Sequence, residues 1–328
     1  MKILVTGGNG NISWWLVRLA IDQGHEVYAI NRGTTLSTRR EFPVEVNKIK
    51  CDIRNFEEAK NALKDLYFDV VCDFICYNKE QAKQAIELYK NKTNHYVFIS
   101  STAVYQRSSL QYPITEKATQ NGLTWDYAKN KSECESIFIE AYRNINFPIT
   151  IVRPGHTYDT IIPSAIGYSD WTIPKRILNS EKSVLHGDGT TLWTITHSSD
   201  FASALLGLFG NPKSIGEDFH ITNDEWLTWR NIYEIMAKIL NVSNIKFYYI
   251  TSEEITRLNI TLGEGLIGHK SWCDIYDNSK IKLFVPEWKP KVSFSEGIQM
   301  TFDFYTDNSQ LKIINSQLNN FLNEICTK

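Results

Sequence analysis

The chain has 328 residues, of which 42% are hydrophobic and 22% are charged, and its formal net charge is −2. This composition is ordinary for a folded globular protein with one large or two smaller domains. The near-neutral charge argues against a sequence-independent nucleic-acid binder, and no apolar stretch approaches the ~20 residues that span a bilayer. We therefore expect neither nucleic acid nor a membrane as a partner.

The chain opens on a short apolar strand, residues 3–6, that passes directly into the glycine-rich sequence from Gly7 to Ser13 and then into a helical pattern. This order is the expected layout of a cradle for a dinucleotide pyrophosphate. Glycine lets the backbone bend tightly and approach the phosphates, and the following helix presents unpaired N–H groups to them. Ser13 stands where the usual pattern has its third glycine. An ordinary strand-to-helix turn is the alternative.

Strand-like and helix-like segments alternate through residues 1–154. Near-continuous apolar strands are typical of a parallel sheet that helices cover on both faces. The alternation therefore predicts an α/β domain, a Rossmann-type doubly wound parallel sheet with ligands at the carboxyl ends of its strands. The predicted strands are 2–6, 26–30, 46–51, 69–75, 95–100 and 148–153, and the predicted helices are 12–23, 55–65, 79–90 and 127–144.

After Arg153-Pro154 this alternation of strands and helices ends, and residues 155–195 are predicted to form loops around a short helix near 172–180. We expect residues 155–328 to form mainly a smaller C-terminal substrate-binding lobe, with segments around 190–225 returning to the first domain. The elements expected in this part are helices near 198–209, 228–240 and 296–306 and a strand near 217–222.

The six cysteines are scattered, mostly within apolar runs, and form no pair at zinc-ligand spacing. His156 and His197 also lack such spacing, so we expect no metal site. Reduced, buried thiols are the expectation, in a cytoplasmic protein without a targeting segment before the first strand.

Tyr127 and Lys131 lie four residues apart at the start of a predicted helix, which puts both side chains on one face. An ammonium near a phenol lowers its pKa toward the range of a general acid or base. A chain of this composition contains about one such pair by chance. Tyr276 and Lys280 form a second copy, which we interpret as structural because it lies outside the sheet series.

Ser101 comes directly after the predicted strand 95–100, at the sheet edge where this fold binds its ligands. Its hydroxyl could hydrogen-bond a substrate oxygen and the Tyr127 hydroxyl together. The alternative is a serine that caps the loop.

The end of the second predicted strand indicates which dinucleotide is bound. An acidic residue there would bind the ribose 2′-hydroxyl of NAD, but this chain has Arg32, with Arg39 and Arg40 close behind. A guanidinium can pair with a 2′-phosphate, so NADP is favoured over NAD. A solvated surface arginine is the alternative.

Together with the segments CDIRN, SSTAVY, YAKNK, IVRPGHTYD and THSSDFASAL, the opening turn resembles the extended short-chain dehydrogenase/reductase superfamily, in its NAD-dependent epimerase/dehydratase family. The resemblance covers nearly the whole chain. It implies that Tyr127 exchanges a proton with a substrate oxygen, that Lys131 holds the cofactor ribose and lowers the tyrosine pKa, and that Ser101 orients the substrate. It also implies further cofactor contacts: Thr6, Gly7, Gly10, Asn11 and Ile12 at the pyrophosphate, and Asp52 and Ile53 at the adenine.

Two departures from the family pattern narrow the reaction. The fourth strand reads CDFICYN, which is similar to an atypical branch that includes the chloroplast stem-loop-binding proteins. Thr102-Ala103 stands where sugar-nucleotide 4,6-dehydratases have an Asp-Glu pair. Without these carboxylates the elimination lacks its proton carriers, so epimerisation or simple carbonyl reduction fits better.

The leading hypothesis is an NAD(P)-dependent oxidoreductase or epimerase acting on a sugar, most of all a nucleotide sugar. One alternative is a reductase or dehydrogenase of a non-sugar alcohol or ketone. Another is a non-catalytic NAD(P)- or RNA-binding protein on the same scaffold. The resemblance suggests a homodimer formed through a helix bundle. Six residues are expected to contact the substrate, because they follow a strand, can stack on a base or can pair with a pyrophosphate. They are Tyr105, His156, Tyr158, Trp171, Arg176 and Trp193.

Overall fold

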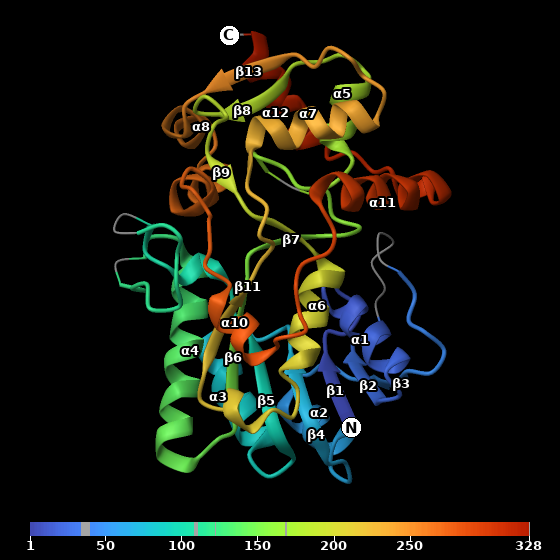
Figure 1. The fold of residues 1–328 in the computed structure, drawn as a ribbon, viewed down its shortest axis with the longest axis vertical. Coiled ribbons are helices and arrows are strands. Elements are labelled where there is room, and N and C mark those ends of the chain that lie inside the picture. The colour runs from blue at the N-terminus through green and yellow to red at the C-terminus, as the bar shows by residue number, and fades with distance from the viewer. Residues whose placement is uncertain (34–39, 108–110, 122, 168, 328) are drawn as a thin grey trace.

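The computed structural model describes residues 1–33, 40–107, 111–121, 123–167 and 169–327. Its centre is a seven-stranded sheet in the order β11-β6-β5-β4-β1-β2-β3, and every neighbouring pair is parallel (Figure 1). The predicted doubly wound Rossmann-type fold is confirmed. The strands are β1 (Lys2–Thr6), β2 (Glu26–Asn31), β3 (Asn47–Lys50), β4 (Phe68–Asp73), β5 (Thr93–Ile99), β6 (Ile149–Pro154) and β11 (Asp218–Ile221).

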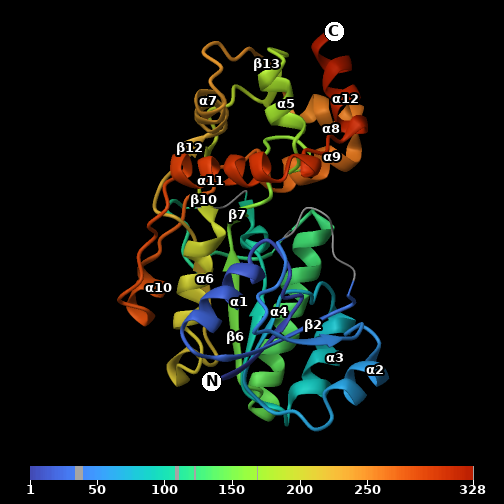
Figure 2. The same ribbon diagram turned by 90° about the vertical axis from the view of Figure 1, so that its right-hand side faces the viewer.

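Side chains alternate between the two faces of this sheet, and both faces are buried. In β1, Ile3 and Val5 pack on one face with α1 (Ser13–Asp22) and α6 (Ser198–Gly207). Leu4 packs on the other face with α2 (Phe56–Ala62), α3 (Lys79–Tyr89) and α4 (Asp126–Ile145). Figure 2 shows α1 and α6 on one side of the sheet and α2 and α3 on the other, as burial on both faces requires.

The sheet is completed by a segment far along the chain. β11 pairs with β6 at the edge, Asp218 opposite Ile151, and α6 lies against α1. The short α10 (Ser279–Phe284) then packs against β11. Residues from both halves of the sequence therefore build the layer that carries the carboxyl ends of the strands.

A second, smaller lobe lies above those carboxyl ends in Figure 1. Its core contains Trp193, Trp229 and Tyr233. Three two-stranded sheets and several helices surround that core. They are β7 (His156–Tyr158) with β10 (Ile195–His197), β8 (Ser183–His186) with β13 (Phe247–Ile250), β9 (Leu192–Trp193) with β12 (Leu227–Thr228), α5 (Thr172–Leu178), α7 (Trp229–Ile239), α8 (Ser252–Leu258), α9 (Ile260–Gly265), a π-helical turn (Leu266–Lys270), α11 (Phe294–Asp307) and α12 (Ser316–Thr327).

Several elements of this lobe are absent from the sequence-based prediction. Helices α8 and α9 span only seven and six residues, too few turns for a 3.6-residue periodicity to stand out. Helix α12 does carry the signal, since Leu318, Leu322 and Ile325 are buried on one face. None of the helices in the described part of the chain is long and apolar enough to cross a membrane.

Candidate functional site

The glycine-rich turn after β1 has the shape that a bound pyrophosphate requires. Gly7 has φ +71°, and a Cβ on it would lie 2.5 Å from Ile75 Cγ2. Ser13 closes the turn, because its hydroxyl donates to the Gly7 carbonyl (2.7 Å) and accepts from the Gly10 N–H (2.7 Å). Helix α1 then begins with no side chain capping its first turn. Its N-terminal N–H groups therefore remain available to an anion, which fits a dinucleotide phosphate.

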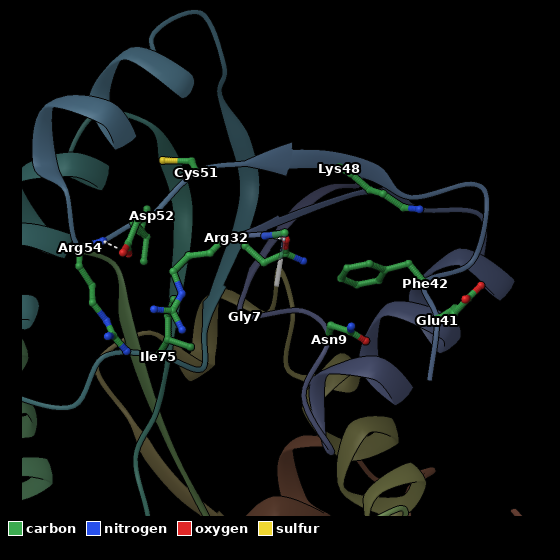
Figure 3. Close-up of a pocket in the computed structure, with 13 residues that line it drawn as sticks. Gly7, Asn9, Arg32, Glu41, Phe42, Lys48, Cys51, Asp52, Arg54 and Ile75 are labelled. Carbon is green, nitrogen blue, oxygen red and sulfur yellow. Dashed lines mark hydrogen bonds between the residues drawn. The ribbon is translucent and has the colours of Figure 1, made fainter. Parts of the chain in front are cut away.

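A pocket of about 580 Å³ opens beside this turn, at the carboxyl ends of β1, β2 and β3 (Figure 3). Figure 3 shows Arg32 and Arg54 on one side of it and Lys48 and Phe42 on the other. Its size suits a nucleoside, and its cations suit a phosphate. The lining residues are Gly7, Asn9, Asn31, Arg32, Gly33, Glu41, Phe42, Lys48, Cys51, Asp52, Ile53, Arg54 and Ile75.

Among the expected cofactor residues, Gly7, Arg32, Asp52 and Ile53 line this pocket. Lys48 and Arg54 also line it, and the sequence reasoning missed both: Lys48 belongs to no recognised motif, and Arg54 lies within the segment CDIRN but was given no role. Thr6, Gly10, Asn11 and Ile12 lie beside the glycine turn or within it, whereas Lys131 lies at the carboxyl edge of β5.

The polar side chains around the turn form hydrogen bonds within the protein. The Thr6 hydroxyl donates to the buried Asp73 carboxylate. The Asn11 amide donates to the Ser198 hydroxyl (2.9 Å), which ties the turn to α6. Ile12 forms the N-cap position of α1 and packs against the sheet core.

The arginines that follow Arg32 in the sequence differ in position. The Arg40 guanidinium donates two hydrogen bonds, of 3.1 and 3.0 Å, to the carboxylate of Asp159, and so it joins the first domain to the second lobe. Its charge is neutralised there and is not free for a 2′-phosphate. Arg39 lies outside the described residues.

Ser101, Tyr127 and Lys131 come together at the carboxyl edge of β5. Ser101 begins the single 3-10 turn after β5, and its hydroxyl accepts from the Ala103 N–H (3.2 Å). The Tyr127 hydroxyl is hydrogen-bonded to the Ser101 hydroxyl. One helical turn later, Lys131 is buried and its Nζ donates to the carbonyls of Cys76 (2.7 Å) and Ile99 (2.8 Å).

The expectation that Lys131 lowers the pKa of Tyr127 is wrong for the protein alone. Burial raises the pKa of the Tyr127 phenol above its ordinary value, and the Ser101 hydrogen bond offsets this only in part. Part of the tyrosine ring remains exposed, but the hydroxyl end is turned inward. The Lys131 ammonium is occupied by two carbonyls, and its own pKa is lowered by burial.

A buried ion pair lies next to this edge of the sheet. Arg153 donates two hydrogen bonds to Glu135, of 2.9 and 2.7 Å, and Ser100 donates to the same carboxylate. Asp218 from the returning β11 pairs with the other side of Arg153 (2.7 Å). Because a buried charge must be paired to be tolerated, this network fixes the backbone next to Ser101.

Five of the six residues expected to contact substrate are interior: Tyr105, Tyr158, Trp171, Arg176 and Trp193. Tyr105 bonds to His220 and Arg153, and Tyr158 packs against His197 and Phe294. Trp171 packs against Phe302 and Tyr305, as part of the core of the second lobe.

Arg176 is the fourth of these residues, and it is only 2% exposed. Its guanidinium is held by Glu181 (3.1 Å), by the carbonyl of Lys182 and by the amide oxygens of Asn319 and Asn323 on α12. None of its charge is left for a pyrophosphate.

Trp193, the fifth, is fully buried in the core of the second lobe, and the part-exposed His156 belongs to the same cluster of aromatic rings. Their ring centroids are 5.8 Å apart, and both pack against Trp229, at 6.2 and 5.0 Å. His269 lies 4.9 Å from Trp193 and stacks on Trp125, whose ring is 4.9 Å from that of Tyr127. An aromatic wall therefore runs from the second lobe to Tyr127.

The sequence reasoning missed Trp125, Trp229 and His269, which come from separate segments. His197 caps α6, since its Nδ1 accepts from the Ser199 N–H at the start of that helix. Tyr276 is buried and bonded to Asp274, away from Tyr127. In the described ranges, no three His, Cys, Asp or Glu side chains gather as metal ligands would.

The chain matches a known protein family. The model of the NAD dependent epimerase/dehydratase family matches residues 3–222. The Arabidopsis thaliana chloroplast stem-loop binding protein of 41 kDa b is 24% identical, over 72% of this chain and 62% of its own length. The 2′-dehydrokanamycin reductase of Streptomyces kanamyceticus is 23% identical, over 71% and 65%. The chain thus spans less than two thirds of the length of these two relatives.

Solved structures with the same fold include enzymes with NAD bound. An epimerase from Methanothermobacter thermautotrophicus superposes with a TM-score of 0.79 at 18% identity, covering 95% of this chain and 94% of that one. UDP-glucuronic acid 4-epimerase from Bacillus cereus, in complex with NAD, has a TM-score of 0.74 at 22% identity, covering 95% and 100%. At these identities the likeness is one of fold.

Proposed function

Because the chain belongs to the NAD-dependent epimerase/dehydratase family of the extended short-chain dehydrogenase/reductase superfamily, we propose that it is an NAD(P)-dependent oxidoreductase of a sugar. The observation that carries the proposal is the Ser101–Tyr127 hydrogen bond next to the buried Lys131, at the carboxyl edge of β5. The glycine turn and the pocket of Figure 3 supply the cofactor site. The second lobe covers the substrate.

The proposed mechanism uses Tyr127 as the proton carrier. A bound nicotinamide supplies or accepts the hydride. The Ser101 hydroxyl orients the substrate oxygen toward the Tyr127 hydroxyl, which transfers the proton. The Lys131 ammonium, which two carbonyls hold in place, would donate its third N–H to the ribose of the bound cofactor.

In the protein alone, Tyr127 is in the protonated form that reduction of a carbonyl requires. A phenol whose pKa is above its ordinary value stays protonated at neutral pH, so it is ready to donate a proton to a carbonyl oxygen. Thr102 and Ala103 are buried and carry no carboxylate, which agrees with the absence of an elimination step. The reductase of 2′-dehydrokanamycin among the relatives also supports reduction.

The proposed substrate is a sugar, but the second lobe offers little support for a nucleotide linked to that sugar. The expected base and pyrophosphate contacts, Trp171 and Arg176, are occupied inside the second lobe. The sugar itself is supported by the fold shared with UDP-glucuronic acid 4-epimerase.

A non-catalytic RNA-binding protein is the second candidate, favoured by the similarity to the chloroplast stem-loop binding protein. The two candidates separate in one experiment, in which purified protein is titrated with NADPH and with a stem-loop RNA. Saturable RNA binding without any NADPH binding would overturn the enzyme proposal.

The substrate is sought by thermal-shift screening of the NADPH-loaded protein against keto sugars and nucleotide sugars. A specific ligand at about 100 times its dissociation constant adds roughly 2.7 kcal/mol of stability. Each compound that stabilises the protein is then tested for hydride transfer through the nicotinamide absorbance. Stabilisation by NADPH with no transfer to any stabilising compound would contradict the proposed reaction.

We propose NADP as the preferred cofactor, because Arg32, Lys48 and Arg54 all line the pocket of Figure 3, which we call the adenosine pocket. In Arg32→Ala, we expect the dissociation constant for NADPH to rise about 10- to 100-fold, since a hydrogen bond between charged groups contributes about 1.5–3 kcal/mol. The constant for NADH should stay within about twofold. Fluorescence titration with both cofactors measures the two constants.

The matched control is Arg143→Ala, which removes an exposed arginine from α4, away from the pocket. It should change neither constant. Equal weakening of NADPH and NADH by Arg32→Ala would contradict the contact with a 2′-phosphate.

A further inference from the structure

Lys270 is a cation without a counter-ion. It ends the π-helical turn Leu266–Lys270, and its Nζ donates one hydrogen bond, to the Ser164 carbonyl (2.7 Å). Within the described ranges no carboxylate pairs with it, and burial lowers its pKa to about 8. A desolvated ammonium is normally paired, so the two further N–H donors of this part-buried side chain can bind an anion from outside the chain.

Other donors without partners surround this ammonium. Lys270 Nζ lies 5.7 Å from the ring of Trp229, whose Nε1 is buried and forms no hydrogen bond. The rings of His156 and His186 lie 6.2 and 6.3 Å from the same indole. His186 Nε2 is also buried without a partner, and the positive charge of Lys270 acts on both imidazoles.

These groups belong to the same wall as the reacting tyrosine. His269 precedes Lys270 in the π-helical turn and stacks on Trp125, at 6.3 Å between ring centroids. Trp125 in turn contacts Tyr127, at 4.9 Å. A substrate lying along this wall would present one end to Tyr127 and the other to Lys270.

We propose that the substrate carries an acidic group, a carboxylate or a phosphate monoester, that pairs with Lys270 and accepts a hydrogen bond from His156. This inference rests on the proposed function, because it describes one group of the molecule that Tyr127 acts on. The wall offers one free positive charge, since Arg107 is paired with Asp274 (2.6 Å) and His269 also bonds to that carboxylate. One acidic group matches that charge.

The pH dependence of binding follows from the groups that face Lys270. The pKa of His156 is lowered to about 3 and that of His186 to about 4 by burial, and burial also lowers that of His269. Asp274 and Asp188 have lowered pKa values and stay ionised.

Lys270 alone therefore titrates between about pH 6 and 10, and it loses its proton as the pH rises. Since the anion needs the ammonium, its dissociation constant should rise about tenfold between about pH 7 and 9.

The test measures binding without turnover, on protein saturated with NADPH, by quenching of tryptophan fluorescence. The probes are D-glucuronate, D-glucose 6-phosphate and D-glucose, so the first two distinguish a carboxylate from a phosphate and the third lacks the acidic group. We expect saturable binding of at least one acidic sugar, about tenfold or more tighter than D-glucose.

In Lys270→Met this preference should disappear, and in Lys270→Arg it should persist in part. The matched control is Lys238→Met, an exposed lysine of α7 in the same lobe, which should bind as the wild type does. NADPH affinity should be unchanged in all three variants, which separates this result from the cofactor site.

The inference is overturned if neither acidic sugar binds better than D-glucose, if Lys270→Met keeps the preference, or if binding does not change across pH 8. The proposed function fails separately, if the wild-type protein binds an acidic sugar in this way but never exchanges hydride with any substrate.

Discussion

Tyr127→Phe should lower the rate of hydride transfer by about 100- to 10,000-fold, the contribution expected of a positioned proton carrier. The substitution removes the hydroxyl that is hydrogen-bonded to Ser101 and leaves the ring against Trp125. The dissociation constant for NADPH should stay within about twofold, because Tyr127 does not line the adenosine pocket. Single-turnover absorbance of the nicotinamide measures the rate, and a fluorescence titration measures the affinity.

The matched control lies on the same helix. Tyr142→Phe removes an exposed hydroxyl near the far end of α4 and should leave the rate unchanged. If Tyr127→Phe turned over as fast as the wild type, the proton would have to come from another group. The assignment of Tyr127 would then be wrong, while the cofactor site could still stand.

Gly7→Ala should weaken NADPH binding by about 10- to 100-fold, since overpacking costs about 1–3 kcal/mol. The new Cβ would lie 2.5 Å from Ile75 Cγ2, and Ile75 lines the pocket. Either the turn or Ile75 must move, and each movement changes the surface that meets the cofactor. The positive φ of Gly7 adds a backbone cost of about 1–2 kcal/mol to folding.

Gly24→Ala separates the two effects of that substitution. Gly24 has φ +77°, close to that of Gly7, but no heavy atom lies within 4 Å of a Cβ placed there. It should lower the free energy of unfolding through the backbone alone and leave NADPH affinity unchanged. Urea unfolding and a fluorescence titration of both variants test this. Equal weakening of NADPH binding in both variants would mean that the loss comes from global destabilisation and not from the pocket.

The first domain could be predicted from the sequence because its signals are local. Ile3, Leu4 and Val5 are all apolar, as a strand buried on both faces requires, and a glycine turn follows directly. Ser101, Tyr127 and Lys131 could be placed together because each lies at a fixed distance from a predicted strand or helix end.

The electrostatics of the site could not be predicted from the sequence in the same way. The raised pKa of Tyr127 depends on what buries its hydroxyl and on the carbonyls that occupy Lys131. Both are long-range consequences of packing. Spacing along a helix gives proximity but not solvation.

The second lobe was harder to predict because its contacts join distant segments. Arg176 has a plausible charge for a phosphate, but its partners on α12 lie more than 140 residues later in the chain. Lys270 has no motif around it, and its importance comes from having no carboxylate partner among the described residues once the chain has folded. Such a role is invisible until burial is known.

The Ser13 hydroxyl, which bridges the Gly7 carbonyl and the Gly10 N–H, has a consequence for the kinetics of cofactor exchange. A turn held by hydrogen bonds to one of its own side chains keeps its shape whether or not a dinucleotide is present. The entropy of ordering the loop is then lost during folding rather than at each binding event. A reductase must release its cofactor after every turnover. A preformed cradle allows that exchange to proceed without the loop having to refold around each new molecule.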